Sequence, residues 1–301
     1  MRRVLSLMLL LALCAMVSAQ ERSHANTVTM NDGSANDDCA QHLHVYNDEY
    51  KASVRDEEVR TIPNQPLTIA AEHNGGIHVT TWDKPEISLK LCKQVAADDE
   101  ATARKIVSEP ELQVSGGNVI IITPEFARDY SVGTLLLVKA PKGASLDMSV
   151  HNGGISLNGF NGTAKAQAKN GGISFKRSSG TLVAEAQNGG ISIKDCSGDV
   201  TANVQNGGLS LSLPEQWEGK GLEAHTHNGG LTVSLPRHFT TAVEIAGSEH
   251  TSIICKDDIC NEAQRTWDNG HKMLRFGSGN PLIRATTVNG GVVVQARRAE
   301  L

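Results

Sequence analysis

The sequence has few aromatic residues, no excess of basic charge, and no apolar run long enough for a lasting membrane span. Aromatic side chains make up 4% of its 301 residues, which fits a thin, flat core without room for rings. The formal net charge is −5 at pH 7. Because such a chain has no general attraction for polyanions, we expect no nucleic-acid partner.

Acidic residues are scarce in the most regular part of the chain. The acids between residues 144 and 213 are Asp147, Glu185, Asp195 and Asp199, and none of them recurs at a fixed interval. Polysaccharide-acting enzymes built on β-helices need clustered carboxylates on one face, and calcium-binding rolls need a repeated aspartate. We therefore expect no catalytic residues, no cofactor and no metal.

Histidine and cysteine patterns do not indicate a metal site either. His225 and His227 share one face of an expected strand, an arrangement that can chelate a metal. No acid or cysteine stands at matching positions, so we interpret both as solvent-facing strand residues. The stretch CKDDIC at 255–260 lacks the second ligand pair of structural zinc sites.

The first 19 residues, MRRVLSLMLLLALCAMVSA, are predicted to be a secretory signal peptide. They combine two arginines, an apolar stretch and small residues before an expected cleavage after Ala19. Lipoprotein anchoring through Cys14 is less favoured, because the preceding Leu13 is bulky where a small residue is usual. Loss of the two arginines takes the net charge to −7. We expect an exported protein of the periplasm or the cell surface.

Export to an oxidising compartment favours disulfides among the five cysteines that remain. Cys255 and Cys260 flank a short polar stretch, so we predict a local disulfide between them. Cys39 and Cys92 are a candidate second pair. That pairing would leave Cys196 as a free thiol at a packed corner, and the sequence leaves the pairing of these three open.

The motif Asn-Gly-Gly, followed by a branched apolar residue, returns at a fixed interval. Its first four copies are 18 residues apart, and the next follows after 22. The copies in this block begin at Asn152, Asn170, Asn188, Asn206 and Asn228. Two more copies, at Asn74 and Asn289, lie outside the block. Self-similarity at a fixed period is the signature of a repeat architecture.

One unit, GTLVAEAQNGGISIKDCS at 180–197, predicts two short strands. Apolar and polar residues alternate on both sides of Gly-Gly, which is the period of a strand with one buried face. Gly-Gly supplies the φ angles of a tight corner, and Gly162, Gly180 and Gly198 recur at the opposite corner. We predict a parallel β-solenoid with about 18 residues per coil, stacked at about 4.8 Å.

By the same alternation the asparagines point inward at the bend. We expect their amides to form a structural ladder inside the core, with hydrogen bonds from coil to coil. The ladder residues are Asn152, Asn170, Asn188, Asn206 and Asn228. Small residues such as Ala184 are expected to face large ones such as Ile191 across the core.

The rest of the chain is expected to lie around this array. Residues 20–60 are polar without sustained periodicity and are expected to be a flexible leader, followed by the solenoid domain at 61–301. One amphipathic helix is predicted at about 97–109, where Pro110 follows an acidic start and apolar positions. Residues 255–273 are expected to be an irregular loop.

Length changes enter the repeat after the second strand of a coil. Insertions at one corner project from one side of a repeat array, where such proteins often bind. The inserted segments contain ring side chains that suit saccharide or protein contact. These candidate binding residues are Trp217, His238, Phe239 and Trp267. The alternative, that the rings cap the open end of a thin core, stays open.

Three stretches resemble the bacterial putative-adhesin family, whose members are exported or envelope-associated and contain a domain of unknown function. They are HNGGIHVTTWDKPEISLKL at 73–91, GTLLLVKAPKGASLDMSVHNGGISL at 133–157 and FGSGNPLIRATTVNGGVVV at 276–294. With the Asn-Gly-Gly repeats, the resemblance covers roughly residues 60–296. It implies a β-solenoid in the cell envelope and no catalytic residues. The longer segment at 255–273 departs from the family's pattern.

These features favour a non-catalytic exported protein that acts as an adhesin-like scaffold or binding module in the cell envelope. An envelope-stress sensing or regulatory protein is the alternative, and a polysaccharide-acting enzyme is less favoured. The expected partner is an envelope protein or a glycan whose identity the sequence does not give.

Overall fold

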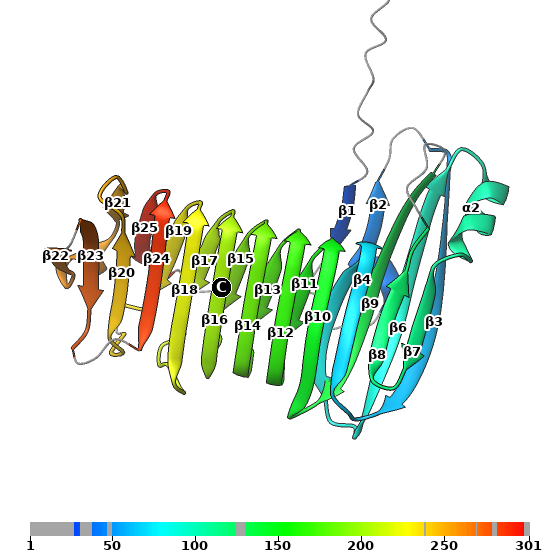
Figure 1. Ribbon diagram of the computed structural model, residues 1–301, viewed down its shortest axis with the longest axis horizontal. Helices are drawn as coiled ribbons and strands as arrows, with labels where there is room; N and C mark the ends of the chain where they lie inside the picture. The colour runs from blue at the N-terminus through cyan, green and yellow to red at the C-terminus, as the bar shows by residue number, and fades with distance from the viewer. Residues whose placement is uncertain are drawn as a thin grey trace, which may run out of the picture.

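The computed structural model describes residues 27–30, 38–46, 50–124, 130–237, 239–268, 270–278 and 282–297. Two large sheets form an elongated two-layered body, with a small two-stranded sheet toward its N-terminal end (Figure 1). The predicted all-β class is confirmed. The predicted signal peptide lies outside the described residues. Within the described ranges, no helix is long and apolar enough to cross a membrane.

The spatial order of strands in the two large sheets differs from their order along the chain. From the C-terminal end of the body to the N-terminal end, the twelve-stranded sheet contains β22 (Gln264–Asp268), β23 (His271–Phe276), β20 (Val243–Gly247), β24 (Ile283–Asn289), β18 (Gly221–Asn228), β16 (Asp199–Asn206), β14 (Ser179–Asn188), β12 (Asn161–Asn170), β10 (Ala144–Asn152), β4 (Leu67–Asn74), β8 (Asn118–Ile122) and β7 (Glu111–Ser115). In the same direction, the eleven-stranded sheet contains β21 (Ile253–Cys255), β25 (Val292–Ala296), β19 (Leu231–Leu235), β17 (Leu209–Ser212), β15 (Ile191–Lys194), β13 (Ile173–Lys176), β11 (Ile155–Asn158), β5 (Gly76–Trp82), β9 (Tyr130–Pro141), β6 (Glu86–Ala97) and β3 (Ala52–Pro63). The remaining elements are β1 (Thr27–Met30), β2 (Leu43–Tyr46), α1 (Cys39–His42), α2 (Glu100–Val107) and η1 (Asp258–Asn261).

Residues 144–235, which we call the regular array, consist of stacked coils (Figure 1). Each coil supplies one long strand to the twelve-stranded sheet and one short strand to the eleven-stranded sheet. Equivalent strands pair in parallel and in register, so that Leu182 pairs with Ala164 on one side and Val200 on the other, 18 residues away in each direction. The short strand provides the return path that parallel pairing requires, because two neighbouring parallel strands cannot be joined by a hairpin.

The core lies between the two sheets and is thin. Every second side chain of β14 and β15 is buried. Ala184 and Ala186 of one sheet share this core with Ile191 and Ile193 of the other. Small side chains on one sheet leave room for branched ones opposite, which lets the sheets approach closely and pack densely.

Both ends of the sheets depart from parallel pairing. β6 runs antiparallel to β3 and β9, and β7 to β8, at the N-terminal end. At the other end β23 runs antiparallel to β20 and β22. The sheets are therefore mixed, in contrast to the wholly parallel arrangement predicted for 61–301. A hairpin stands at each end of the sheets in place of a further coil. The outermost strand therefore does not present an edge on which another identical coil could stack.

The chain does not fill the coil positions in sequence order. β24 pairs in parallel with β18 on one side and with β20 on the other, so the C-terminal coil lies between two coils that precede it. At the N-terminal end β9 likewise lies between β5 and β6. Each end of the array is therefore held together by contacts between segments far apart in the sequence.

The N-terminal segment contains more regular structure than the flexible leader expected at 20–60. β3 pairs along its whole length with β6, and β1 pairs with β2. Leu43 packs on Leu135 beside the disulfide between Cys39 and Cys92. β3 is an edge strand with mostly exposed side chains, so it lacks the apolar alternation by which a buried strand is recognised in a sequence.

The helix α2 lies inside the range 97–109 predicted to be helical. Asp99 caps it by accepting a hydrogen bond from Thr102 N at 2.9 Å, and the bonds from Thr102 lower the pKa of the Asp99 carboxyl. Ile106 packs on Val95 of β6 in a small separate cluster. The helix thus covers the N-terminal end of the body (Figure 1).

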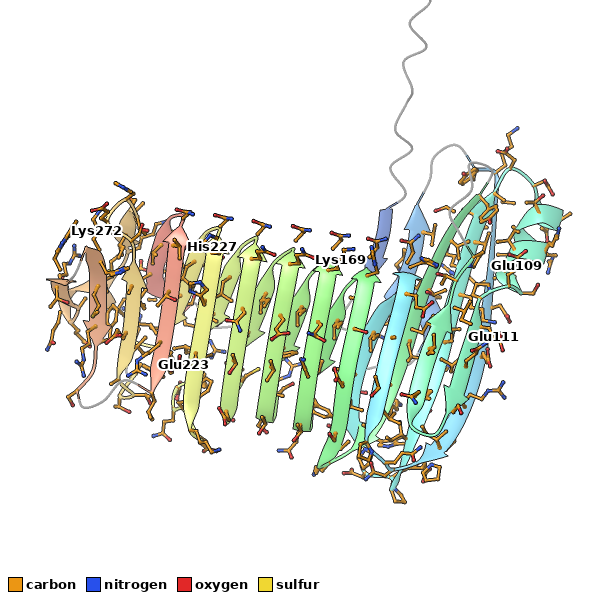
Figure 2. All side chains as sticks on the ribbon, viewed as in Figure 1. Glu109, Glu111, Lys169, Glu223, His227 and Lys272 are labelled. Carbon is orange, nitrogen blue, oxygen red and sulfur yellow. A yellow bond between two sulfur atoms is a disulfide. The ribbon has the colours of Figure 1, made fainter. Side chains whose placement is uncertain are left out.

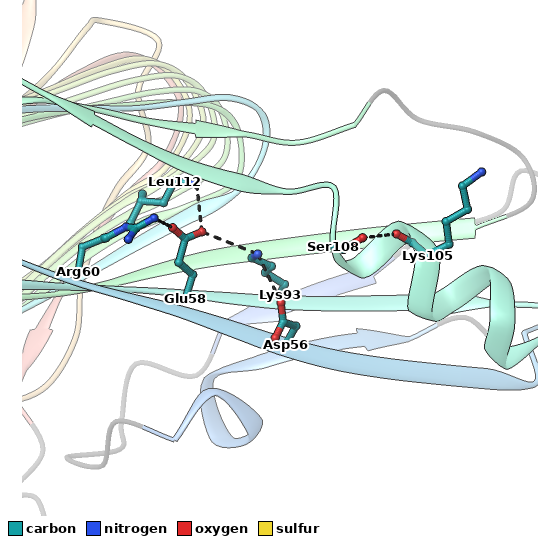
Figure 3. A network of polar contacts seen from close by, with 7 residues as sticks. All are labelled: Asp56, Glu58, Arg60, Lys93, Lys105, Ser108 and Leu112. Carbon is teal, nitrogen blue, oxygen red and sulfur yellow. Dashed lines mark hydrogen bonds and ion pairs between the residues drawn. The ribbon is translucent and has the colours of Figure 1, made fainter.

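A buried lysine connects the polar groups at this end (Figure 3). Lys93 Nζ lies 3.4 Å from Asp56 Oδ2 and 3.8 Å from Glu58 Oε2. Glu58 also pairs with Arg60 and accepts a hydrogen bond from the backbone N of Leu112 at 3.4 Å. Because Glu58 belongs to β3 and Leu112 to β7, the network joins the edge strands of the two sheets.

The structure contains the predicted local disulfide and one disulfide among the three cysteines whose pairing the sequence left open. Cys255 is joined to Cys260, and Cys39 to Cys92. Cys196 is free and buried, and burial raises the pKa of its thiol to about 11. The thiol therefore stays protonated at neutral pH, and a buried thiol of this kind is unreactive.

The segment 255–273, expected to be an irregular loop, contains η1 and β22 and part of β23. β22 and β23 form an antiparallel hairpin at the C-terminal end of the twelve-stranded sheet. Leu274 and Phe276 of β23 are buried in the main core. The second half of the segment therefore continues the sheet, while residues 256–263, which include η1, contain no strand.

Candidate binding groove

The asparagines form a continuous row along one corner of the array. Each side-chain amide after the first in the row donates to the side-chain oxygen of the asparagine before it in the row, at 2.9–3.3 Å. The row runs through Asn74, Asn152, Asn170, Asn188, Asn206, Asn228 and Asn289. It therefore includes the two copies of the motif that lie outside the sequence block.

This row is exposed, which corrects the expectation of a ladder inside the core. In β14 the alternation of buried and exposed side chains holds up to Ala186, and then Gln187 and Asn188 are both exposed. The strand begins to turn before the asparagine, so alternation no longer predicts the direction of its side chain. The amides stabilise the stacking from the outside, where water competes for the same hydrogen bonds.

From Asn152 onward, the backbone of the neighbouring coil requires that the first residue after each asparagine be glycine. Gly189 has a φ of 157°, and a Cβ added there would overlap the carbonyl oxygen of Gly171 in the preceding coil. Gly189 N in turn donates to Asn206 O at 2.9 Å in the following coil. Close approach of backbone to backbone thus excludes any side chain at this position.

A groove of about 1110 Å³ follows these corners along the eleven-stranded sheet. It spans six coils, from the coil of β4 and β5 to that of β18 and β19. Glycine backbone forms much of its lining, together with a column of hydroxyl side chains. The column consists of Ser156, Ser174, Ser192, Ser210 and Thr232. These residues alternate with buried ones on the short strands, so they face away from the core.

The N-terminal end of the groove is its most buried part. Ser156 is 8% exposed, and its Oγ has no hydrogen-bond partner among the described residues. Its neighbour across the strands is His78, whose ring lies 5.3 Å from that of His42. Thr134 also lines this end and donates from Oγ1 to Asn74 O at 2.8 Å.

The groove has no ionisable side chain in its lining, unlike the outer face of the twelve-stranded sheet. That face has a shallower hollow of about 730 Å³, lined by charged and imidazole groups that include Lys169 and His227 (Figure 2). Gln167 there donates to Glu185 at 2.7 Å. The lining of the groove is thus uncharged, whereas the lining of the hollow on the other sheet is mixed in charge.

No group of three or more His, Cys, Asp or Glu side chains in the described part of the chain is placed to hold a metal ion. His225 Nδ1 lies 2.8 Å from Thr286 Oγ1, on the outer face of β18 and β24. His227 is exposed on the same strand. The two histidines thus lie on the same face of β18, and no further His, Cys, Asp or Glu of the described residues completes a metal site with them.

Trp217, predicted to be an exposed binding residue, lies in the core. It is 8% exposed and belongs to the main hydrophobic cluster. The ring lies at the corner opposite Asn-Gly-Gly, where Phe160, Ser178 and Cys196 are the buried residues of earlier coils. This column of buried residues was the sequence signal for the burial of Trp217, because each coil places a buried side chain at this corner.

The other predicted binding residues are not gathered into one open surface. Trp267 is 61% exposed on the edge strand β22, with Lys272 Nζ at 5.5 Å from the centre of its ring. Phe239 is half-buried against the main core. His238 lies outside the described residues. Of the two that the structure describes, Trp267 is the one whose ring is exposed to a ligand.

Comparison with known proteins gives structural likenesses at low sequence identity. No protein-family model matches the chain, and no curated protein matches it. A putative cell adhesion protein from Clostridium sporogenes is 10% identical, with a TM-score of 0.30, over 81% of this chain and 100% of that one. A putative adhesin from Bacteroides fragilis is 12% identical, with a TM-score of 0.34, over 80% and 97%. A putative lipid binding protein from Parabacteroides distasonis is 12% identical, with a TM-score of 0.37, over 80% and 97%. Likenesses at these TM-scores carry no argument about function.

We predict that Asn188→Ala lowers the free energy of unfolding by about 1 kcal/mol, because it removes two exposed amide hydrogen bonds, to Asn170 and from Asn206. The matched variant Gln187→Ala, also exposed, should change it by less than about 0.5 kcal/mol. Urea unfolding followed by circular dichroism measures both. Equal values for the two variants would show that the row of asparagines adds no stability.

Asn289 is predicted to deamidate fastest of the seven asparagines in the row. The reaction starts when the following glycine nitrogen attacks the side-chain carbonyl carbon and expels ammonia; water then opens the succinimide to aspartate or isoaspartate. In the other six corners this N–H is bonded to an asparagine carbonyl of the next coil, as Gly229 N is to Asn289 O at 2.8 Å. Gly290 N has no such bond within the described residues. Peptide mapping after incubation in mildly alkaline buffer compares the seven sites, and equal rates would contradict the prediction.

Trp217 and Trp267 should differ sharply when truncated. Trp217→Ala leaves a cavity in the core and should cost about 3–5 kcal/mol of stability. Trp267→Ala removes an exposed ring and should cost less than about 0.5 kcal/mol. Thermal and urea unfolding of both variants provide the measurement. A small cost for Trp217→Ala would mean that its ring is not packed in the core.

Proposed function

We propose that the protein is an exported, non-catalytic binding module of the cell envelope, adhesin-like in character. Its stacked coils form a parallel β-solenoid that serves as a rigid scaffold. The in-register parallel pairing of β10 through β18, with coils offset by 18 or 22 residues, supports this description of the array. The hairpins at the two ends terminate the solenoid.

One observation carries the proposal, namely the open groove along six coils. Its walls are backbone and short side chains of paired strands, so its shape is fixed before a ligand arrives. A preformed site loses little conformational entropy on binding. A site that extends along a repeat array is suited to a long ligand contacted at many equivalent points.

The chemistry of the groove favours binding over catalysis. Its lining offers hydroxyl groups, amide groups, backbone and the branched apolar side chains that follow the glycines, and no carboxylate, imidazole or amine. Hydrolysis or elimination needs a group that moves a proton near the reacting bond. A ligand in this groove would meet hydrogen-bonding groups and no general acid or base.

The two disulfides fit an oxidising compartment outside the cytoplasm. We accordingly place the mature chain in the periplasm or at the cell surface, after removal of residues 1–19. The partner is an envelope protein or a glycan, and the exposed Trp267 is a second candidate contact point away from the groove.

The test is a binding screen of the mature chain, residues 20–301, against a glycan array, peptidoglycan and envelope extracts. We expect saturable binding to at least one of these, with no low-molecular-mass product released from a bound polysaccharide. Trp267→Ala, measured in parallel, separates binding at the aromatic edge from binding elsewhere. Release of products would contradict the non-catalytic proposal, and a lack of any binding would contradict the proposed function as a whole.

A further inference from the structure

At two of the Asn-Gly-Gly corners the second glycine is not required by the fold in the way that the first one is. At Gly208 and Gly230 φ lies outside the left-handed region. A Cβ added at either position would lie 3.7 Å from its nearest neighbour, an ordinary van der Waals contact. At the first glycine, Gly207, the same Cβ would overlap the backbone of Gly189. Both second glycines line the groove, so the absence of a side chain at these two positions keeps the groove open.

The second glycine also leaves a backbone donor in the groove lining. Its carbonyl accepts a hydrogen bond from the preceding coil, as Gly190 O does from Ile173 N at 3.0 Å. Its own N–H makes no backbone hydrogen bond within the described residues. This holds for Gly154, Gly172, Gly190, Gly208 and Gly230. Backbone donors of this kind are strong hydrogen-bonding groups that normally find a partner.

The hydroxyl column runs beside these glycines, with one Ser or Thr from each coil of the regular array. Ser156 at its N-terminal end is more than nine-tenths buried, and its Oγ lacks a partner among the described residues. A buried hydroxyl without a partner is costly unless something supplies the hydrogen bond. Ser156 therefore points to a polar ligand at this end of the groove.

The spacing of these groups selects among extended ligands. Each column repeats at the interstrand distance of about 4.8 Å. An extended peptide advances about 3.4 Å per residue and drifts out of step with the columns. An acyl chain would leave the hydroxyl and amide groups unpaired, and a polyanion would meet no positive charge in the lining. One sugar of an extended β-linked glycan is close in length to the coil spacing. Its C–H face can pack on bare glycine while its hydroxyls pair with serine.

We propose that the groove binds an extended, uncharged, β-linked glycan that lies along the stack with one sugar per coil. This inference rests on the proposed function and names the ligand class and the contact residues. The second glycines provide the flat floor, and the Ser156-to-Thr232 column provides the repeated hydrogen bonds. The affinity then grows with the number of coils that the glycan covers, up to the six that line the groove.

The first experiment measures affinity against ligand length by calorimetry on the mature chain. The probes are chito-oligosaccharides, which are uncharged and β-linked, in a series of increasing length. We expect the affinity to rise with each sugar until about six and then to level off, since one coil spacing of about 4.8 Å accommodates one sugar. Malto-oligosaccharides of equal length are the matched control, because their α-linkages coil the chain. Equal affinity for both series, or no dependence on length, overturns the proposal.

The second experiment fills the groove. Gly208→Ala/Gly230→Ala adds two methyl groups to its floor without backbone strain, and we expect a loss of affinity of about tenfold or more. The control is Asn203→Ala/Gln205→Ala, two exposed residues on the outer face of the other sheet, which should leave the affinity unchanged. Circular dichroism and thermal melting check the fold of both. If the glycine variant does not fold, Ser192→Ala/Ser210→Ala, which removes two hydroxyls, replaces it.

The outcomes separate this inference from the proposed function. If chito-oligosaccharides bind equally well to the groove variants, the site lies elsewhere, and the groove is the wrong position for the ligand while a binding module remains. If a peptide or a lipid binds in the groove and glycans do not, the ligand class is wrong. If the screen finds no ligand of any kind, both proposals fail together.

Discussion

The rest of the structure depends on the contact between stacked Gly-Gly corners. There the backbone of one coil lies directly against the backbone of the next, so that a methyl group at Gly171 would overlap the carbonyl of Gly153. No side chain separates the coils at this corner, and they stack at the strand spacing. This contact helps to keep the strands on both sides of the corner in register, because a slip that moved the asparagine into the place of the first glycine would put a side chain where only hydrogen fits.

In-register stacking turns each position of the repeat into a column of neighbouring side chains. A column of identical charges about 4.8 Å apart would repel, whereas a column of amides or hydroxyls can form hydrogen bonds along its length. The regular array follows this rule for its acids, whereas Lys176 and Lys194 are neighbours of like charge on adjacent short strands. Its columns are asparagine at the corner, serine on the short strands and alanine in the core, and where Glu185 occurs its neighbour Gln167 donates to it. The scarcity of acids is thus a consequence of the stacking as well as an argument against catalysis.

The sequence predicts what is local and repeated. The period of 18, the glycine corners and the bridge between Cys255 and Cys260 all follow from neighbours along the chain. Two features were not predicted, because one depends on where a strand begins to turn and the other on contacts with residues far away in the sequence. Asn188 is exposed because the bend starts before it, and Trp217 is buried because its loop folds back onto a corner that earlier coils define. The groove itself could not be predicted, since it exists only where second glycines of different coils come side by side.

The two ends of the molecule are built from contacts of a different kind. The N-terminal end uses the Lys93 network and the helix α2, and the C-terminal end uses the inserted coil of β24 and β25 and a hairpin. These contacts are unique in the chain, so neither end depends on how many coils lie between them. An additional coil inside the regular array would lengthen the groove by about 4.8 Å and leave both ends unchanged. The number of coils therefore sets the length of the groove, while the ends set where the stacking stops.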